Sequence, residues 1–228
     1  MRRWLVSLLL LLATLAAPVA GEDLRGRLQL LEKGGKRPAK GSDVRQAVVF
    51  FEPAGGAPVR PPASPFVMST RDKQFVPRVL TIPKGSRVRF PNEDVILHNV
   101  FSVAGRNSFD MGLYKKGTCK EHRFEEAGLV RVFCNVHHSM VGYVWVLDTP
   151  FTATPDANGN FVLTGLPKGP GRLTVWHEQA EPRTVDVQVP RAEPAMATLE
   201  IARPRIPPHL NKSGKSYFGS QRDRYNQP

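Results

Sequence analysis

Alternation between hydrophobic and polar positions runs through most of the chain, whereas helical periodicity is hard to find. Val88 and Phe90 alternate with two arginines, as expected of a strand that is buried on one face. The segments 47–51 and 141–147 are continuous apolar runs of strand length, which indicates buried strands. Further strands are expected at 28–30, 75–82, 161–163, 172–176, 184–189 and 197–201, with a hairpin at 124–134. The pattern predicts an all-β chain.

Turn-forming residues separate these segments. Seven of the thirteen residues at 53–65 are Pro or Gly, which indicates a linker or an irregular crossing. The run 154–160 has Asp or Asn at three alternate positions, as calcium loops do, but Phe161 and Pro167 stand where such a loop needs Gly and Glu. A hairpin turn is therefore the better interpretation of this run.

The N-terminus is typical of an export signal. Two arginines follow the initial Met, and residues 4–17 carry no charge. This run is too short to cross a bilayer, which takes about 20 apolar residues, and small residues follow it up to a cleavage position before Glu22. A buried N-terminal helix is the alternative interpretation. Residues 1–21 are thus predicted to be a signal peptide, and the mature chain is expected to be periplasmic or secreted, with no transmembrane segment.

The chain of 228 residues is basic, since 32 Lys and Arg outnumber 20 Asp and Glu and give a net charge of +12. Cleavage would remove Arg2 and Arg3 and leave +10, which favours encounter with an acidic protein partner. Residues 203–228 contain six Lys or Arg and one Asp without an apolar period, so we expect a flexible basic arm that could touch an anionic surface. Nucleic acid is not an expected partner, because an exported chain without a recognition motif does not suit it.

Sulfur and imidazole groups gather in one short segment. Cys134, His137 and Met140 lie within seven residues, between one expected strand and the next, and His98 lies 36 residues upstream. Two His, one Cys and a weak axial Met form the ligand set of a blue-copper electron-transfer site. Soft sulfur suits Cu(I) and nitrogen suits Cu(II), so this set can bind one copper ion in both oxidation states.

Two other interpretations of these residues remain open. Cys119 and Cys134 are the natural pair for a disulfide in an exported chain, although a hairpin over 124–134 places their side chains on opposite faces. Cys134 and His137 could in principle be a nucleophile and its base, but no orienting acid or oxyanion motif is visible. We therefore expect a binding protein and not an enzyme.

Residues 66–148 resemble the cupredoxins, and among these the amicyanin and plastocyanin type. The resemblance rests on Val88-Arg-Phe-Pro-Asn92, His98-Asn-Val100, Phe124-Glu-Glu-Ala-Gly128 and Cys134-x-x-His137-x-x-Met140. It implies a Greek-key β-sandwich with one type 1 (blue) copper ion. It makes His98, Cys134 and His137 the equatorial ligands and Met140 the axial ligand. It also gives Asn99 hydrogen bonds that tie the two ligand loops together.

The chain departs from this family pattern at two positions. His138 stands where related loops often have Pro, which bears on the rigidity of the loop and on the reduction potential. Cys119 is an additional thiol and a possible competing sulfur ligand. Among the other histidines, His122 and His177 are expected to be structural, and His209 is expected to be solvated in the tail.

The flanking sequence resembles a different family, the carboxypeptidase-regulatory-like β-sandwiches. The resemblance rests on Ala47-Val-Val-Phe50, Asp156-x-Asn-Gly-x-Phe161, Gly165-Leu-Pro-x-Gly169 and Leu173-Thr-Val175. We infer that the cupredoxin stretch is inserted into, or packs between the parts of, this second small β-sandwich. The expected organisation is strands and linker at 22–65, a cupredoxin domain at 66–148, the rest of the second sandwich at 149–202 and the tail at 203–228.

The whole arrangement resembles exported bacterial proteins of the methylamine-utilisation or plastocyanin-like kind. The leading hypothesis is a periplasmic type 1 copper protein that carries single electrons, and its positive net charge favours an acidic partner such as a cytochrome or a dehydrogenase. Two alternatives stay open, namely a module that holds or delivers copper, and an adhesive β-sandwich without a redox function.

Overall fold

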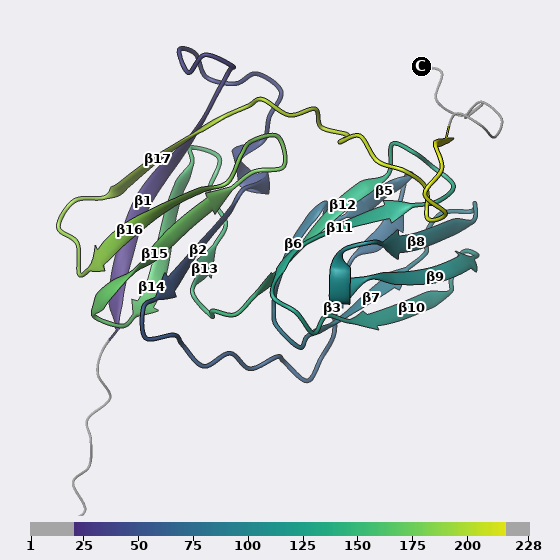
Figure 1. The fold of residues 1–228 in the computed structure, drawn as a ribbon, viewed down its shortest axis with the longest axis horizontal. Coiled ribbons are helices and arrows are strands. Elements are labelled where there is room, and N and C mark those ends of the chain that lie inside the picture. Colours follow the sequence, from purple (N-terminus) through teal and green to yellow (C-terminus); the bar gives the residue numbers. More distant parts are fainter. Residues whose placement is uncertain (1–20, 218–228) are drawn as a thin grey trace, which may run out of the picture.

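The computed structural model describes residues 21–217, and the strands of this part form two lobes that lie side by side (Figure 1). Strands at both ends of the described chain build one of them, which we call the flanking lobe. Strands between residues 66 and 147 build the other, which we call the insert lobe. The expected signal peptide lies, except for Gly21, outside the described residues.

The flanking lobe is a sandwich of two sheets. In the first, β1 (Glu22–Leu31) lies between β14 (Asn160–Leu166) and β17 (Ala195–Glu200). In the second, β2 (Val48–Pro53) lies between β13 (Thr152–Ala153) and β15 (Gly169–Trp176), and β16 (Arg183–Val189) completes the sheet. A 3₁₀ turn at Val44–Gln46 leads into β2. Because β1 and β2 pair with strands that follow residue 151, residues 66–147 are an insertion in this lobe.

The insert lobe is a second sandwich. Its larger sheet has the order β6 (Val79–Pro83), β12 (Val141–Leu147), β11 (Gly128–Cys134), β8 (His98–Ser102) and β9 (Phe109–Tyr114). Its smaller sheet has the order β10 (Cys119–Arg123), β7 (Arg87–Pro91) and β3 (Phe66–Val67). The hairpin of β4 (Ser69–Arg71) and β5 (Gln74–Val76) and a 3₁₀ turn at Gly105–Asn107 complete the lobe. The expected all-β class is confirmed.

The two continuous apolar runs of the sequence are strands that are covered on both faces. In β2, Val49 and Phe51 pack into the core of the flanking lobe, whereas Val48 and Phe50 pack into a cluster shared by the two lobes. Strand β12 has the corresponding position in the insert lobe. Val144 and Val146 pack into the core of that lobe, whereas Val141, Tyr143 and Leu147 pack into the shared cluster. A strand with two buried faces has no polar alternation, which explains why these runs differ from the others.

An ion pair crosses the junction between the lobes. The guanidinium Nε of Arg78 donates to both carboxylate oxygens of Glu178, at 2.9 and 2.8 Å, and Nη1 donates to the carbonyl of Val141 at 2.9 Å. The Glu178 side chain is 1% exposed. A buried carboxylate is stable only when it is paired and hydrogen-bonded, so this contact fixes how the lobes meet.

Two expectations about the course of the chain are wrong. The segment 124–134 is not a hairpin, because β10 pairs with β7 in the smaller sheet while β11 pairs with β12 and β8 in the larger one. Residues 125–127 therefore cross between sheets. Residues 203–217 are not a free arm, since they run from the flanking lobe to the insert lobe and lie against it (Figure 1). We call residues 203–217 the strap; residues 218–228 lie outside the described part. No helix in residues 21–217 is long and apolar enough to cross a membrane.

Candidate metal centre

Antiparallel strands bring the first two candidate ligands together. His98 is the first residue of β8 and Cys134 is the last residue of β11, and the two strands pair in antiparallel register with Cys134 opposite Val100. The beginning of one strand and the end of its antiparallel neighbour lie at the same edge of a sheet. Residues 36 positions apart in sequence thus meet at one end of the insert lobe.

A tight loop adds the third candidate ligand. After Cys134 the chain turns through residues 135–140 and returns in β12, and two backbone hydrogen bonds close this loop. The N–H of Met140 donates to the carbonyl of His137 at 3.1 Å, and the N–H of Cys134 donates to the carbonyl of Met140 at 3.2 Å. These bonds place His137 over the end of β11.

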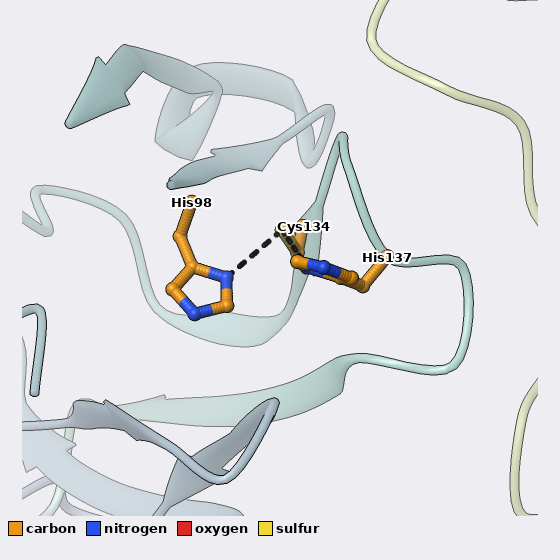
Figure 2. A group of neighbouring side chains, drawn as sticks. All are labelled: His98, Cys134 and His137. Atoms are coloured by element: carbon orange, nitrogen blue, oxygen red, sulfur yellow. Dashed lines mark hydrogen bonds between the residues drawn. The ribbon is translucent and has the colours of Figure 1, made fainter. Parts of the chain in front are cut away.

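The three side chains converge on one point. The thiol Sγ of Cys134 lies 3.6 Å from Nδ1 of His98 and 3.6 Å from Nδ1 of His137 (Figure 2). Their ligand atoms all lie within 4.8 Å of one another. All three residues are buried, with His98 and Cys134 at 0% exposure and His137 at 5%. Within residues 21–217, His98, Cys134 and His137 form the one group of three or more His, Cys, Asp or Glu side chains that are close enough to hold a metal ion.

The separation of these atoms fits a metal ion between them. A trigonal or tetrahedral ion that keeps about 2.0–2.1 Å to imidazole nitrogen and about 2.3 Å to thiolate, as zinc does, leaves the nitrogen and the sulfur about 3.5–3.8 Å apart. The observed value of 3.6 Å lies inside this range for both histidines. Mixed imidazole and thiolate donors suit copper or zinc and not calcium or magnesium, which prefer oxygen.

A carboxylate orients the first histidine. Oδ2 of Asp94 lies 2.8 Å from Nε2 of His98, which leaves Nδ1 of His98 directed at the thiol of Cys134. The backbone N–H groups of Asp72 and Lys73 donate to the same carboxylate at 2.7 and 3.0 Å. A carboxylate on the outer nitrogen of a ligating histidine fixes its tautomer and raises its basicity.

Hydrogen bonding also decides the charge of this carboxylate. Burial works to raise the pKa of Asp94, but donors from Lys73, His98 and Asp72 outweigh it and lower the pKa. Asp72 and Lys73 form the turn between β4 and β5, with φ of 52° and 55°. Left-handed backbone at two successive residues is typical of a hairpin turn. It allows both N–H groups to point at Asp94.

Met140 lies beside these ligands in the core of the insert lobe. Its side chain is 1% exposed and belongs to the same buried cluster as Cys134. The loop hydrogen bonds described above keep its backbone against that of Cys134. The role of its thioether as the axial ligand stays a prediction.

Asn99 connects the two ligand segments, though not with its side chain. Its backbone carbonyl accepts a hydrogen bond from the N–H of Asn135, the residue after Cys134, at 3.0 Å. Its side-chain Nδ2 donates to Oδ1 of Asp110 on β9 at 2.6 Å. Burial works to raise the pKa of Asp110, but donors from Lys212, from Asn99 and from the N–H of Gly112 outweigh it and lower the pKa to about 2.

The additional cysteine stays apart from this site. Cys119 and Cys134 are both free thiols, which excludes the disulfide between them in this structure. The hairpin expected between the two cysteines is absent, and Cys119 instead pairs with Pro91 in the smaller sheet. Its Sγ accepts a hydrogen bond from Nε of Arg89 at 3.2 Å. His122, which was expected to be structural, is half-buried, and its ring stacks on Phe109.

Several residues around the site were not expected from the sequence. The sequence offered one indication that Asp94 contacts His98, namely its position four residues earlier, and it offered none for Asp110. His209 was expected to be solvated, but its ring stacks on Phe133 with a centroid separation of 4.2 Å, and burial lowers its pKa. Tyr217 donates a hydrogen bond to the carbonyl of Cys134. Contacts of this kind between distant segments leave no local pattern in a sequence.

Comparison with known proteins gives limited likenesses. Neither a family model nor a curated protein matches the chain. Among solved structures, a copper-containing nitrite reductase from Thermus scotoductus SA-01 is 26% identical over 39% of this chain and 25% of its own, with a TM-score of 0.35. A purple cupredoxin from Nitrosopumilus maritimus is 27% identical over 36% of this chain and 96% of its own, with a TM-score of 0.32. A reduced amicyanin variant is 23% identical over 43% of this chain and 99% of its own, with a TM-score of 0.35. TM-scores of this size assign neither a family nor a function to the whole chain.

Proposed function

We propose that this protein is an exported type 1 copper protein that carries single electrons between redox partners. One copper ion would be bound by His98, Cys134, His137 and Met140. The observation that carries the proposal is the convergence of two Nδ1 atoms on one buried thiol at 3.6 Å, with both histidines buried. Copper bound there supplies a couple between the +1 and +2 states, so that one electron enters from a donor and leaves to an acceptor.

The residues of the site suit a carrier better than an enzyme. Asp94 and the loop hydrogen bonds preset His98 and His137, so that the ligand atoms need to move little when the charge of the ion changes. Burial of all three ligands leaves little room for a substrate next to the ion. The net charge of about +10 after cleavage favours an acidic protein, such as a cytochrome or a dehydrogenase, as the partner. Export is proposed from the N-terminal sequence alone.

The decisive experiment is a visible and electron paramagnetic resonance spectrum of the chain 22–228 loaded with Cu(II). We expect an intense blue or purple colour that ascorbate bleaches and air or ferricyanide restores. Cys134→Ser will abolish the colour, because the thiolate bond to copper produces it. Cys119→Ser is the matched control and will keep it, since Cys119 lies in another sheet. A blue Cys134→Ser protein would falsify the ligand assignment.

The alternatives of a copper-delivery module and a non-redox sandwich give different results in the same samples. Tight Cu(I) binding without reversible voltammetry identifies a module that holds or delivers copper. Absence of any copper binding by the wild-type chain leaves a β-sandwich without a redox function.

A further inference from the structure

Ion pairs fasten the strap along its whole course. Residues 203–217 contain four Lys or Arg and no acid, and three of these cations pair with acids of the two lobes. Arg203 pairs with Glu181, Arg205 lies 3.8 Å from Glu178 at the lobe junction, and Lys212 lies 2.7 Å from Asp110. Three of the four positive charges of the strap thus hold it against the two lobes.

The end of the strap packs its rings around the metal-binding loop. The ring of His209 stacks on Phe133, the residue before Cys134, and on His138, the residue after His137, with centroid separations of 4.2 and 4.6 Å. The ring of Tyr217 meets His138 and His209 edge-on, at 4.9 and 5.3 Å. Offset and edge-to-face contacts of this kind stabilise a packed arrangement. The rings thus contact one residue that precedes Cys134 and one that follows His137 in the sequence.

Hydrogen bonds from the strap reach the loop itself. Oη of Tyr217 donates to the carbonyl of Cys134 at 3.0 Å, and the N–H of Lys212 donates to Oδ1 of Asn135 at 3.0 Å. Nζ of Lys212 also meets Asp110, whose other oxygen accepts from Asn99, the neighbour of His98. Both ligand segments are thereby connected to the same short piece of chain.

We propose that the strap is a built-in part of the metal centre, in which Tyr217 and Lys212 are positioning residues that keep the ligand loop in one geometry. This inference rests on the proposed function, because a fixed ligand loop keeps the donor atoms in place while the ion gains or loses an electron. The loop 135–140 begins where β11 ends, and contacts from the strap add to the hydrogen bonds that the loop makes with its own lobe. Contacts from a third segment restrict its motion without occupying any ligand atom.

The test compares three variants of the chain 22–228. Tyr217→Phe keeps the ring and removes the hydroxyl, and Lys212→Met removes the contact with Asp110. Lys215→Met is the matched control, because its ammonium makes no ion pair in the described residues. Circular dichroism in the near ultraviolet checks that each variant keeps its packing.

The first measurement needs no metal. Amide hydrogen exchange of residues 133–140 in the metal-free chain will be about 2–10-fold faster in Tyr217→Phe, the factor that corresponds to one lost hydrogen bond of about 0.5–1.5 kcal/mol. Lys212→Met will show a smaller increase, and Lys215→Met will match the wild type. Unchanged exchange in both Tyr217→Phe and Lys212→Met overturns the proposal.

The second measurement uses the copper-loaded chain. Release of Cu(II) to a chelator will be about 2–10-fold faster in Tyr217→Phe, for the same reason, and the thiolate absorption band will broaden. A chain that binds no copper yet shows faster exchange contradicts the proposed function while the strap keeps its role in the loop. Unchanged exchange with normal blue copper contradicts the strap alone.

Discussion

The two lobes have the same architecture but different interiors. The main core cluster of the flanking lobe is apolar, and the buried polar residues near it, Thr149, Thr174, His177 and Glu178, offer no group of metal ligands. The core of the insert lobe includes Cys134 and Met140, and His98, Asn99 and His137 are buried beside them. Buried polar groups destabilise a fold unless they have partners. Among the described residues, the insert lobe thus keeps at one end a set of buried groups that a metal ion can satisfy.

The largest effect is expected from a cavity in the apolar core. Phe51 is 0% exposed and packs between the two sheets of the flanking lobe. Phe51→Ala will lower the free energy of unfolding by about 3–5 kcal/mol, because it removes a buried ring and leaves a void. Denaturant unfolding measures this loss. Copper affinity should not change, and a large fall in affinity would show that the two interiors are not separate.

The next effect lies at the junction. Arg78→Met leaves the buried carboxylate of Glu178 with Arg205 alone, at 3.8 Å. Removal of one partner of a buried ion pair typically costs about 3–5 kcal/mol, and we expect about 3 kcal/mol because Arg205 remains. Unfolding followed separately by tryptophan fluorescence and by the copper colour will then show two transitions. Coincident transitions at unchanged stability would contradict the role assigned to this pair.

A smaller effect, confined to the insert lobe, is expected from Asp94→Asn. Loss of the carboxylate that orients His98 will weaken Cu(II) binding about 10–100-fold. It will also raise the reduction potential, because the carboxylate favours the more highly charged ion. The neighbouring Glu93→Gln is a matched control, since Glu93 pairs with the exposed Arg71 and makes no contact with His98. Competition with a chelator and voltammetry measure both quantities; equal affinities for the two variants would argue against the role of Asp94.

The smallest effect is one of pH. The pKa of Asp110 is lowered from 3.8 to about 2 in the folded chain. A group with a lowered folded pKa contributes its full stability above the unfolded pKa and loses it as the pH falls. The contact with Lys212 will therefore weaken between about pH 4 and pH 2. The Asp110 side chain is 43% exposed, so solvent screening limits the change to less than about 1 kcal/mol. Thermal unfolding between pH 5 and pH 2 will show a steeper fall for the wild type than for Asp110→Asn; equal slopes would contradict it.

The sequence predicted the strands better than their partners. Alternation and apolar runs located β1, β2, β7, β12 and most strands after residue 151, because one or two buried faces impose a local pattern. The same pattern does not say which strands pair, and the segment 124–134 was therefore wrongly joined into a hairpin. Three of the proposed ligands, His98, Cys134 and His137, lie together as the motif suggested. A thiol and an imidazole at this short spacing are typical of a metal site.

The surroundings of the ligands could not be predicted in this way. Asp94 reaches His98 because a turn with left-handed backbone supports it, and that turn belongs to another segment. Tyr217 lies 83 residues from Cys134 in the chain. The basic residues of the strap were interpreted as a solvated tail, because their acidic partners lie in distant parts of the sequence, in both lobes.

The insertion also decides the order in which the protein can take shape during synthesis. Gly26 of the first strand pairs with Phe161 and with Ala195, so this strand cannot complete its pairing until residue 195 has been added. The strands of the insert lobe are complete once residue 147 has emerged. Pairings between distant residues form slowly. The sandwich of the insert lobe can therefore form early in an emerging chain, whereas the sheet that contains the first strand and the strap over the metal-binding loop are completed late.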